Sequence, residues 1–394
     1  MLRSRPAGRI RPQLDRLRCV LEEIGNPQHR FPSVLIVGSN GKGSTSAMLD
    51  ALLRGHGVLS GLYTSPHLVR VEERIRIDGV AVSETELGRV LSMLDRHEDL
   101  TFFEMLTAAA FSIFADAGVE VAVLEAGMGG SFDATRLADS AIAGLTNIGS
   151  DHSKWLGADR ADRAHDKGRA LHAARRAVLG RGVDAGDLEA IDVPAAVAAD
   201  SLISCKDLGG GRVGLTFDRA TLELEIPLTG SFQRDNLQLA VALALDVVAE
   251  GWMPDLDPSL VAKAMRDLRW PGRLSAHDIA GRQILLDCAH NLEAAEALAR
   301  HLDEAGKRYN LVFSCLDDKP VEKMAALLRP RVDQVAICQL EDERAMPIDR
   351  LRAAFPNAVI AADPLDCVHL LDDPVLAAGS IRLIGGLLAH EGGD

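Results

Sequence analysis

A group of glycines around a single lysine could bind phosphate. The apolar residues Val34–Val37 are followed by Gly38, by Gly41-Lys42-Gly43 and by a helical pattern over 44–53. Glycine lets backbone N–H groups approach phosphate oxygens, a helix N-terminus attracts anions, and lysine adds a point charge. We therefore predict a nucleoside triphosphate site that comprises Asn40, Gly41, Lys42, Gly43, Ser44 and Thr45.

This loop departs from the strict phosphate-loop pattern. That pattern has glycine five residues before the Gly-Lys pair and Ser or Thr directly after the lysine. Here Ile36 occupies the first position and Gly43 follows Lys42, so the hydroxyl groups of Ser44 and Thr45 come one residue late. The sequence thus indicates a particular subclass of phosphate loop.

Polar residues also stand at the ends of other strand-like runs, namely Ser65, Glu125 and the pair Asp151-His152. Glu125 is either a surface residue or a Mg²⁺ ligand. A phosphate loop in the same sheet favours the metal role, because Mg²⁺ prefers hard oxygen ligands and phosphate. His152 is equally compatible with a buried hydrogen-bonding role, and Asp151 with a helix cap.

Later in the sequence, four residues could either have an ordinary structural role or belong to a binding site. Lys167 alone is typical of a solvated helix lysine. Asp287 and His290 lie three residues apart after a strand-like run and could face a nucleotide, although Asn291 is also a good helix N-cap. Arg273, in a Pro-Gly-Arg turn, is either a surface arginine or a phosphate clamp.

Strand and helix patterns alternate along most of the chain, which predicts an α/β fold with a mainly parallel sheet. In such sheets ligands bind at the carboxyl ends of the strands, so we expect the polar residues on one rim. Residues 180–230 predict a short antiparallel excursion. The predicted helices cover 84–96, 104–117, 236–250, 258–268, 292–305 and 321–328, and the predicted strands cover 59–63, 119–124, 141–148, 283–287, 309–314 and 334–339.

Length and composition narrow the class of protein. A chain of 394 residues should form about two domains, and the turn at Trp270-Pro271-Gly272-Arg273 predicts a boundary between 1–269 and 270–394. The net charge of −14 argues against nucleic-acid and anionic-membrane partners. No apolar run spans a bilayer, the basic N-terminus lacks the apolar part of a signal peptide, and the six cysteines are scattered. We therefore expect a cytoplasmic protein.

Together these motifs resemble the dihydrofolate synthase/folylpolyglutamate synthase family of the Mur ligase superfamily. The similarity covers nearly the whole chain and includes Gly-Ser-Asn-Gly-Lys-Gly-Ser-Thr at 38–45, Leu-Glu-Ala-Gly-Met-Gly-Gly at 124–130 and Asp-Cys-Ala-His-Asn at 287–291. Further matching segments are 63–68, 73–79, 102–111, 131–135, 151–157, 230–236, 270–274 and 378–381.

The resemblance implies a Mur-ligase-like fold, with a P-loop ATPase domain over 1–269 and a smaller, Rossmann-like glutamate-ligase domain over 270–394. It also implies a monomeric, ATP-dependent amide ligase. Such an enzyme joins the carboxylate of dihydropteroate, or of a folate, to the amine of L-glutamate through an acyl phosphate. Making dihydrofolate, extending polyglutamate and doing both are equally compatible with these residues.

Roles for single residues follow from the resemblance alone. Catalytic roles fall to Lys42, His152 and Lys167. Ser65, Glu125, His152 and Lys167 match the ligands of two Mg²⁺ ions, and Lys167 aligns with a lysine that is carbamylated in the family. Nucleotide contacts are implied for Asn236, Arg273, Asp287 and His290, and a pterin pocket for Phe103, Asp133 and Ala134.

The chain departs from the family pattern at several points. Lys167-Gly168-Arg169-Ala170 replaces the usual Lys-Ala-Gly-Ile, Ser131 stands where arginine is common, and Leu292 replaces a proline. Residues 180–230 and the segment before the phosphate loop are short. These departures leave two other functions open: a Mur-type amide ligase for a non-folate carboxylate, and a non-catalytic nucleotide-binding paralogue.

Overall fold

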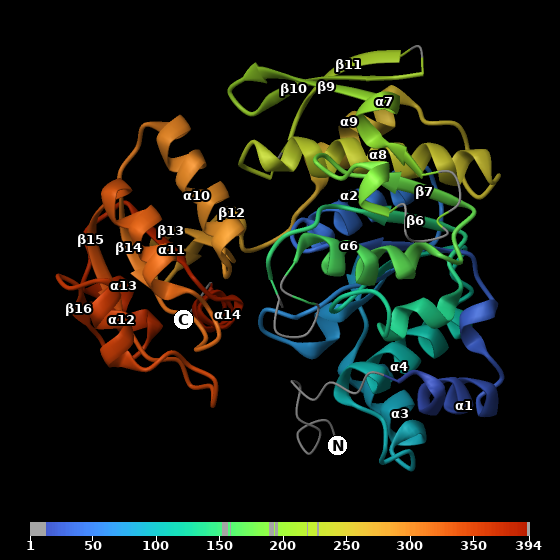
Figure 1. The fold of residues 1–394 in the computed structure, drawn as a ribbon, viewed down its shortest axis with the longest axis horizontal. Coiled ribbons are helices and arrows are strands. Elements are labelled where there is room, and N and C mark those ends of the chain that lie inside the picture. Colours follow the sequence, from blue (N-terminus) through green and yellow to red (C-terminus); the bar gives the residue numbers. More distant parts are fainter. Residues whose placement is uncertain are drawn as a thin grey trace. The chain divides into compact units, whose positions relative to one another are not determined.

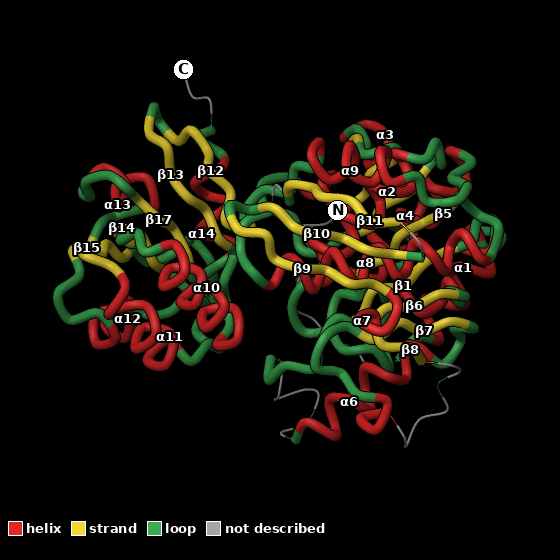
Figure 2. The backbone as a smooth tube through the Cα atoms, turned by 90° about the horizontal axis from the view of Figure 1, so that it is seen from above, coloured by secondary structure: helices red, strands yellow, loops and turns green. Residues whose placement is uncertain are grey.

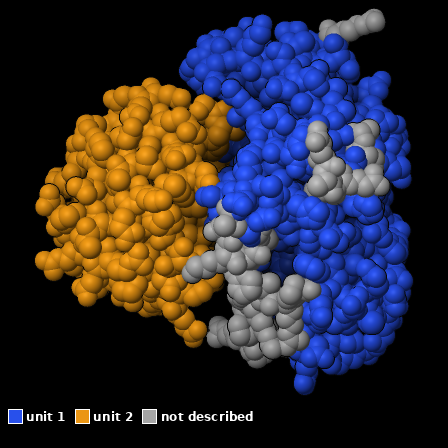
Figure 3. Space-filling model, viewed as in Figure 1, with its two compact units in different colours: residues 1–66, 72–227, 233–268 blue, residues 67–71, 228–232, 269–394 orange. Residues whose placement is uncertain are grey.

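The computed structural model describes residues 13–151, 157, 159–188, 193, 196–218, 220–226 and 228–391. The chain forms two compact units, shown in different colours in Figure 3. The first comprises residues 1–66, 72–227 and 233–268, and the second comprises 67–71, 228–232 and 269–394. Two short segments thus belong to the second unit before the chain finally enters it at Arg269.

An eight-stranded sheet with the order β4-β3-β2-β5-β1-β6-β7-β8 forms the first unit. Its strands β2, β5, β1, β6, β7 and β8 are parallel, and β3 and β4 are antiparallel. The predicted α/β class with a mainly parallel sheet is therefore confirmed. The strands are β1 (Ser33–Val37), β2 (Ser60–Tyr63), β3 (Ile75–Ile77), β4 (Val80–Ala81), β5 (Val121–Glu125), β6 (Ile142–Leu145), β7 (Arg176–Leu179) and β8 (Ala196–Ala198).

Helices cover both faces of this sheet, so its central strands β1 and β5 are buried along their whole length. Figure 1 shows α2, α8 and α9 on one side of the strands and α3 and α4 on the other. Thr101 and Glu104 form a capping box, which starts α4 two residues before the predicted position. The helices are α1 (Asp15–Glu23), α2 (Lys42–Gly55), α3 (Glu84–Leu94), α4 (Phe102–Ala117), α6 (Arg160–Gly168), α8 (Phe232–Ala249) and α9 (Pro258–Asp267).

A separate antiparallel sheet follows α7 (Ala199–Leu202), and it comprises β9 (Ile203–Gly209), β10 (Arg212–Phe217) and β11 (Ala220–Glu225). Its three strands are the yellow tubes labelled β9, β10 and β11 in Figure 2. The predicted antiparallel excursion is confirmed for these strands. It is wrong for β8, which lies in the same region but extends the parallel sheet instead.

The second unit has a six-stranded sheet with the order β12-β13-β17-β14-β15-β16. Only the first pair, β12 with β13, is antiparallel. Apolar clusters fill both faces of the sheet. Its elements are β12 (Arg273–Ile279), β13 (Arg282–Asp287), α10 (Leu292–Ala305), β14 (Tyr309–Phe313), α11 (Val321–Leu328), β15 (Val332–Ile337), α12 (Ile348–Ala354), β16 (Val359–Ile360), α13 (Pro364–His369), β17 (Val375–Ala378) and α14 (Ile381–Leu388).

All six cysteines are free thiols, and four of them are buried. Within the described part of the chain, no helix is long and apolar enough to cross a membrane.

Two glycine substitutions in the first unit should change stability in opposite directions. A Cβ at Gly61 of β2 would lie 2.9 Å from Cδ1 of Phe114 in α4, whereas one at Gly88 of α3 would meet nothing within 4 Å. We expect Gly61→Ala to destabilise the unit by about 1–3 kcal/mol through overpacking. Gly88→Ala should stabilise it by roughly 0.5–1 kcal/mol, because alanine loses less backbone entropy in a helix. Urea unfolding of both variants measures the difference, and equal shifts would contradict the packing described here.

Candidate functional site

Four neighbouring parallel strands, β2, β5, β1 and β6, end at the same edge of the first sheet. Ser65 follows β2, Glu125 ends β5, the phosphate loop follows β1, and Thr146 follows β6. The topology therefore places the sequence-predicted Ser65, Glu125 and phosphate loop on one rim, together with Thr146, which was not predicted. His152 was predicted to join them but lies outside the described residues.

The phosphate loop adopts a backbone conformation that depends on its glycines. Gly38 and Gly41 have φ angles of 147° and 84°. A Cβ at Gly38 would overlap the Thr146 hydroxyl, and one at Gly41 would overlap the side-chain oxygen of Asn236. Lys42 is the first residue of α2, and its Nζ donates to the carbonyls of Gly38 and Ser39 at 3.1 and 3.3 Å. The loop thus curls around its own lysine at a helix N-terminus, where anions are favoured.

Residues 146 and 147 hold the loop from the neighbouring strand. Thr146 Oγ1 and Asn147 Nδ2 donate to the carbonyl of Asn40 at 2.6 and 3.1 Å, and the Asn40 N–H donates to Asn147 Oδ1 at 3.0 Å. The N–H of Ser39 also donates to the carbonyl of Asn147 at 3.2 Å. Neither residue was predicted from the sequence. Their only signal was their place directly after a buried strand.

Two groups on the rim are suited to a phosphate-bound cation. Glu125 is only 4% exposed, and its Oε2 accepts the backbone N–H of Ser65 at 3.0 Å. Thr45 is fully buried, and its hydroxyl oxygen has no hydrogen-bond partner among the described residues. A buried polar atom without a partner is costly, so Thr45 is more stable when a ligand supplies that partner. The donor set of hydroxyl and carboxylate oxygens fits Mg²⁺.

Lys167 is only 1% exposed, so its interpretation as a solvated helix lysine is wrong. It belongs to α6, and a Cβ on Gly130 would lie 2.9 Å from its Cα, which shows how closely the 127–131 loop approaches the helix. Burial lowers the pKa of Lys167 to about 8, and the nearby charge of Lys42 contributes to the lowering. At this pKa about one tenth of the amine is neutral and nucleophilic at pH 7, far more than for a lysine with the ordinary pKa.

Several polar residues near α6 were also considered from the sequence, either as a helix cap or as part of the site. Asp159 is the N-cap residue of α6. The expected helix-capping role of Asp151 stays a prediction, because residues 152–156 lie outside the described residues. Ser131 is bound to the same helix, because its N–H and hydroxyl donate to Asp166 at 3.3 and 3.4 Å. No group of three or more His, Cys, Asp or Glu side chains within the described ranges could hold a metal ion. The predicted ligand set instead combines Glu125 with Ser65, Lys167 and His152, of which His152 lies outside the described residues.

An amide pair lies beside the phosphate loop at the start of α8. Asn236 Nδ2 donates to Gln233 Oε1 at 2.9 Å, and the Asn236 oxygen faces Gly41. Gln233 is fully buried, and its Nε2 has no hydrogen-bond partner among the described residues. Gln233 was not predicted from the sequence, although its place one helical turn before a predicted nucleotide contact was a usable signal.

The three residues predicted to line a pterin pocket lie close to this rim. Phe103 stacks on Tyr63 with ring centroids 5.8 Å apart, and a Cβ on Gly127 would lie 2.7 Å from the Phe103 ring. Asp133 is buried, which raises its pKa, and it accepts the N–H groups of Thr135 and Met128 at 3.0 Å each. The neighbouring Ala134 is buried too. Asp133 therefore shapes the loop, and Phe103 offers an aromatic ring.

The second unit brings together Arg273, Asp287 and His290. Asp287 ends β13 and accepts the N–H groups of Leu274 and Ala289 at 3.0 and 2.9 Å. Burial raises its pKa to about 6, although Arg273 and His290 both favour the charged form. His290 Nδ1 lies 2.9 Å from the carbonyl oxygen of Cys288. Asn291 caps α10, as its sequence position suggested, by accepting the N–H of Ala294 at 2.9 Å.

The buried carboxyl group of Asp287 should make stability depend on pH. Its folded pKa of about 6 lies above the ordinary value of 3.8. The protonated group therefore contributes stability below about pH 4, and this contribution is lost as the pH rises to about 6. Between about pH 4.5 and 6.5 we expect wild type to lose melting temperature relative to Asp287→Asn, with a constant difference above that range. A difference that is independent of pH would contradict the raised pKa.

Comparison with known proteins shows to which family this sequence is similar. The sequence matches the Mur ligase middle domain over residues 36–157 and the Mur ligase glutamate ligase domain over 272–384. A Mycobacterium tuberculosis protein named dihydrofolate synthase/folylpolyglutamate synthase is 33% identical over 385 residues, which cover 89% of this chain and 78% of that protein.

Two further proteins with related names are also similar to this chain. A Haloferax volcanii protein named probable bifunctional folylpolyglutamate synthase/dihydropteroate synthase is 34% identical over 95% of this chain, which spans only 48% of that longer protein. The Yersinia pestis folylpolyglutamate synthase/dihydrofolate synthase, solved with AMPPNP and Mn ion, superposes with a TM-score of 0.86 at 26% identity and covers 98% of this chain and 95% of its own. The chain therefore belongs to the dihydrofolate synthase/folylpolyglutamate synthase family of Mur ligases.

Proposed function

We propose that this chain is an ATP-dependent ligase that joins L-glutamate to 7,8-dihydropteroate, to a folate γ-carboxylate, or to both. The observation that carries the proposal is the placing of a buried Lys167 and a buried Glu125 around the phosphate loop of Lys42. Relatives that are named for these activities, and one solved with AMPPNP and Mn ion, support it. We further propose that the enzyme is monomeric and cytoplasmic, as the sequence suggested.

The reaction needs charge neutralisation, because a carboxylate must attack the γ-phosphate of a polyanion. Lys42 supplies a positive charge at the N-terminus of α2, and the N–H groups of residues 41–44 bind phosphate oxygens, whereas those of Asn40 and Thr45 donate to Asn147 and Gly41. The carboxylate oxygen forms a bond to phosphorus and ADP leaves, which gives an acyl phosphate. The amine of glutamate then forms the amide bond, phosphate leaves, and the amine loses a proton.

The metal ligands proposed for this chain are Ser65, Glu125, His152 and a carbamylated Lys167. Mg²⁺, when bound, supplies positive charge to the phosphate oxygens, and we propose two such ions. Carbamylation joins the neutral amine of Lys167 to carbon dioxide, with loss of one proton, and makes a carboxylate-like ligand. The lowered pKa of Lys167 supports this step, because only the neutral amine reacts.

The remaining proposed contacts divide between nucleotide and pterin. Asn236, with Gln233 beside it, is proposed to bind the adenine base, since a carboxamide can both donate and accept hydrogen bonds. Arg273, Asp287 and His290 are proposed nucleotide contacts of the second unit. Phe103, Asp133 and Ala134 are proposed to line the pterin pocket, where Phe103 stacks on the ring system.

Purified protein given ATP, Mg²⁺, glutamate and either dihydropteroate or a folate should release phosphate only when all four are present. Release that does not depend on the pterin would refute the folate-ligase proposal. ADP formation triggered only by a non-folate acid would favour a different Mur-type ligase, and ATP binding without any turnover would favour a non-catalytic paralogue. Complementation of strains that lack each activity separates dihydrofolate synthesis from polyglutamate extension.

Lys42→Ala should lower kcat by about 10²–10³-fold, because one charge that stabilises the transferring phosphoryl group is lost. Its melting temperature should change little, since Lys42 Nζ donates to carbonyls of its own loop. Lys263→Ala is the matched control, because Lys263 is an exposed residue of α9. Unchanged turnover in Lys42→Ala would contradict the phosphate role.

Lys167→Ala should also lose activity, and short carboxylates such as acetate or formate should restore part of it by replacing the carbamate. Steady-state assays over a series of acid concentrations measure this rescue, with Lys42→Ala as the variant that carboxylates cannot restore. A Lys167→Ala enzyme that stays inactive at every acid concentration, while still folded, would argue against the carbamate.

A further inference from the structure

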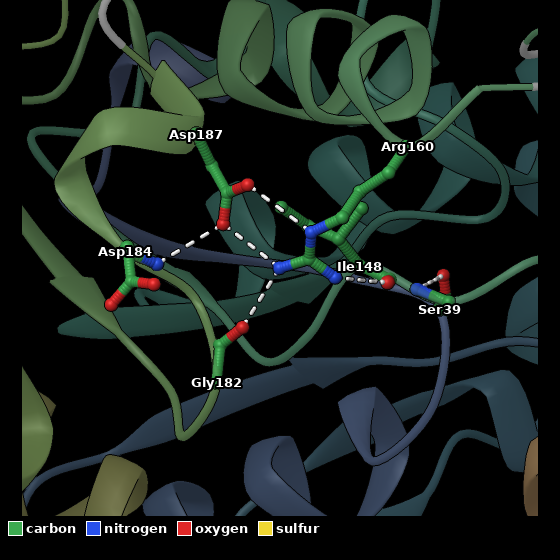
Figure 4. A network of polar contacts seen from close by, with 7 residues as sticks. Ser39, Ile148, Arg160, Gly182, Asp184 and Asp187 are labelled. Carbon is green, nitrogen blue, oxygen red and sulfur yellow. Dashed lines mark hydrogen bonds and ion pairs between the residues drawn. The ribbon is translucent and has the colours of Figure 1, made fainter.

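Residues 146–149, which follow β6, form a segment that contacts two other parts of the first unit. We call it the bridging segment. On one side it holds the phosphate loop through Thr146 and Asn147, as described above, and through the N–H of Gly149, which donates to Ser39 Oγ at 2.8 Å. Figure 4 shows the contact at Ser39 close to the carbonyl of Ile148. The backbone of the phosphate loop is therefore fixed by the bridging segment at two consecutive residues, Ser39 and Asn40.

On the other side, two arginines of α6 bind the carbonyls of the same segment. Arg160 Nη1 donates to Ile148 O at 3.0 Å (Figure 4). Arg163 Nε donates to Gly149 O at 2.7 Å, and its Nη1 donates to Gly157 O at 3.2 Å. Consecutive residues of the bridging segment thus contact successive turns of one helix. A planar guanidinium with several fixed donors is well suited to hold two carbonyl groups at once.

Arg160 is itself held from a third direction. Its Nε and Nη2 donate to the two carboxylate oxygens of Asp187 at 3.1 and 2.8 Å, and Nη2 also donates to Gly182 O at 2.8 Å (Figure 4). The Asp187 carboxylate accepts the N–H of Asp184 as well. A bidentate arginine–carboxylate pair has a defined geometry. Arg160 therefore connects the start of α6 to the 182–187 turn as well as to the bridging segment.

Arg163 differs from Arg160 in its burial and its position. It is 8% exposed, whereas nearly half of the Arg160 side chain is accessible. Arg163 lies four residues before Lys167, so both side chains lie on the same face of α6. A buried guanidinium is costly unless its donors are satisfied, and at Arg163 backbone carbonyls of Gly149 and Gly157 satisfy part of this need. The contact to Gly149 is thus made one helical turn from Lys167.

We propose that Arg163 is a positioning residue of the ligation reaction, which sets the distance between Lys167 and the phosphate loop through Gly149 and the bridging segment. Arg160 supports the same connection from the first turn of α6. This inference rests on the proposed function, in which Lys167 and Lys42 act on the same phosphates. Because displacements of about 1 Å in an active site can lower rates 10²-fold, loss of this contact should affect turnover more than nucleotide binding.

The test compares Arg163→Met, Arg163→Lys and the matched control Arg176→Met. Arg176 forms ion pairs with Asp246 and Glu250 at the start of β7, far along the strand from the rim. We expect Arg163→Met to lower kcat by about 10-fold or more while KM for ATP changes less than about threefold. Arg163→Lys should recover part of kcat, since an ammonium can still donate to Gly149 O. Arg176→Met should keep the wild-type kcat.

Hydrogen exchange of the same variants gives a readout that needs no catalysis. In Arg163→Met, amides of residues 146–149 and of the phosphate loop should exchange faster, while those of α4 stay unchanged. Wild-type kcat in Arg163→Met would overturn the proposal. So would a loss of kcat that matches the loss of folded protein and is equal in Arg163→Lys. If wild type itself does not ligate, the proposed function fails, and the exchange data alone then decide whether Arg163 holds the loop.

Discussion

The interaction on which the site depends is the close contact between the phosphate loop and the backbone after β6. Gly38 can approach Thr146 only because it lacks a Cβ, and the resulting space lets Thr146 and Asn147 bind both the N–H and the carbonyl of Asn40. Parallel pairing of β1 with β6 brings Gly38 and Thr146 to the same level along the two strands. The loop conformation is thus fixed by the sheet, and Lys42 and the start of α2 are placed by that conformation.

Buried charge is the second theme of the first unit. Lys167, Glu125 and Arg163 are all nearly inaccessible. Glu125 accepts a backbone N–H and Arg163 donates to a backbone carbonyl, whereas Lys167 lies near the opposite charge of Asp166 and the like charge of Lys42. Buried ionisable groups reduce stability unless they are well paired, so proteins keep them mainly where chemistry needs them. Ion pairs nearer the surface, such as Arg176 with Glu250, have a smaller desolvation cost, because water still reaches them.

Much of the fold and part of the site could be predicted from residue types. The phosphate loop is identifiable because glycines, a lysine and a helix start seldom occur in that order unless they bind phosphate. α10 was predicted with its observed bounds, since its N-cap Asn291 and its terminal Gly306 are both local signals. In contrast, α6 has no apolar stripe, so the helix that carries Lys167 was not delimited by its pattern. β16 and β17 were missed for a related reason: short strands are specified by pairing partners far along the chain.

The missed site residues share one physical property. Thr146, Asn147, Gln233 and Arg163 are ordinary residue types whose importance comes from partners in other elements. Asn147 binds a residue 107 positions away, which no local pattern can encode. The interpretation of Lys167 as a solvated residue was wrong for the same reason, because segments outside its own helix, such as the loop at Gly130, approach it closely.

The position of α8 has a consequence for how the chain acquires its binding site. Asn236 and Gln233 lie beside Gly41, yet nearly two hundred residues separate them in sequence. A ribosome-bound chain that has already paired β1, β5 and β6 still lacks this side of the proposed nucleotide site. Nucleotide affinity should therefore emerge late in synthesis, and a bound nucleotide would then favour the completed unit by mass action. Tight binding of ATP would therefore be expected only after α8 has joined the first unit.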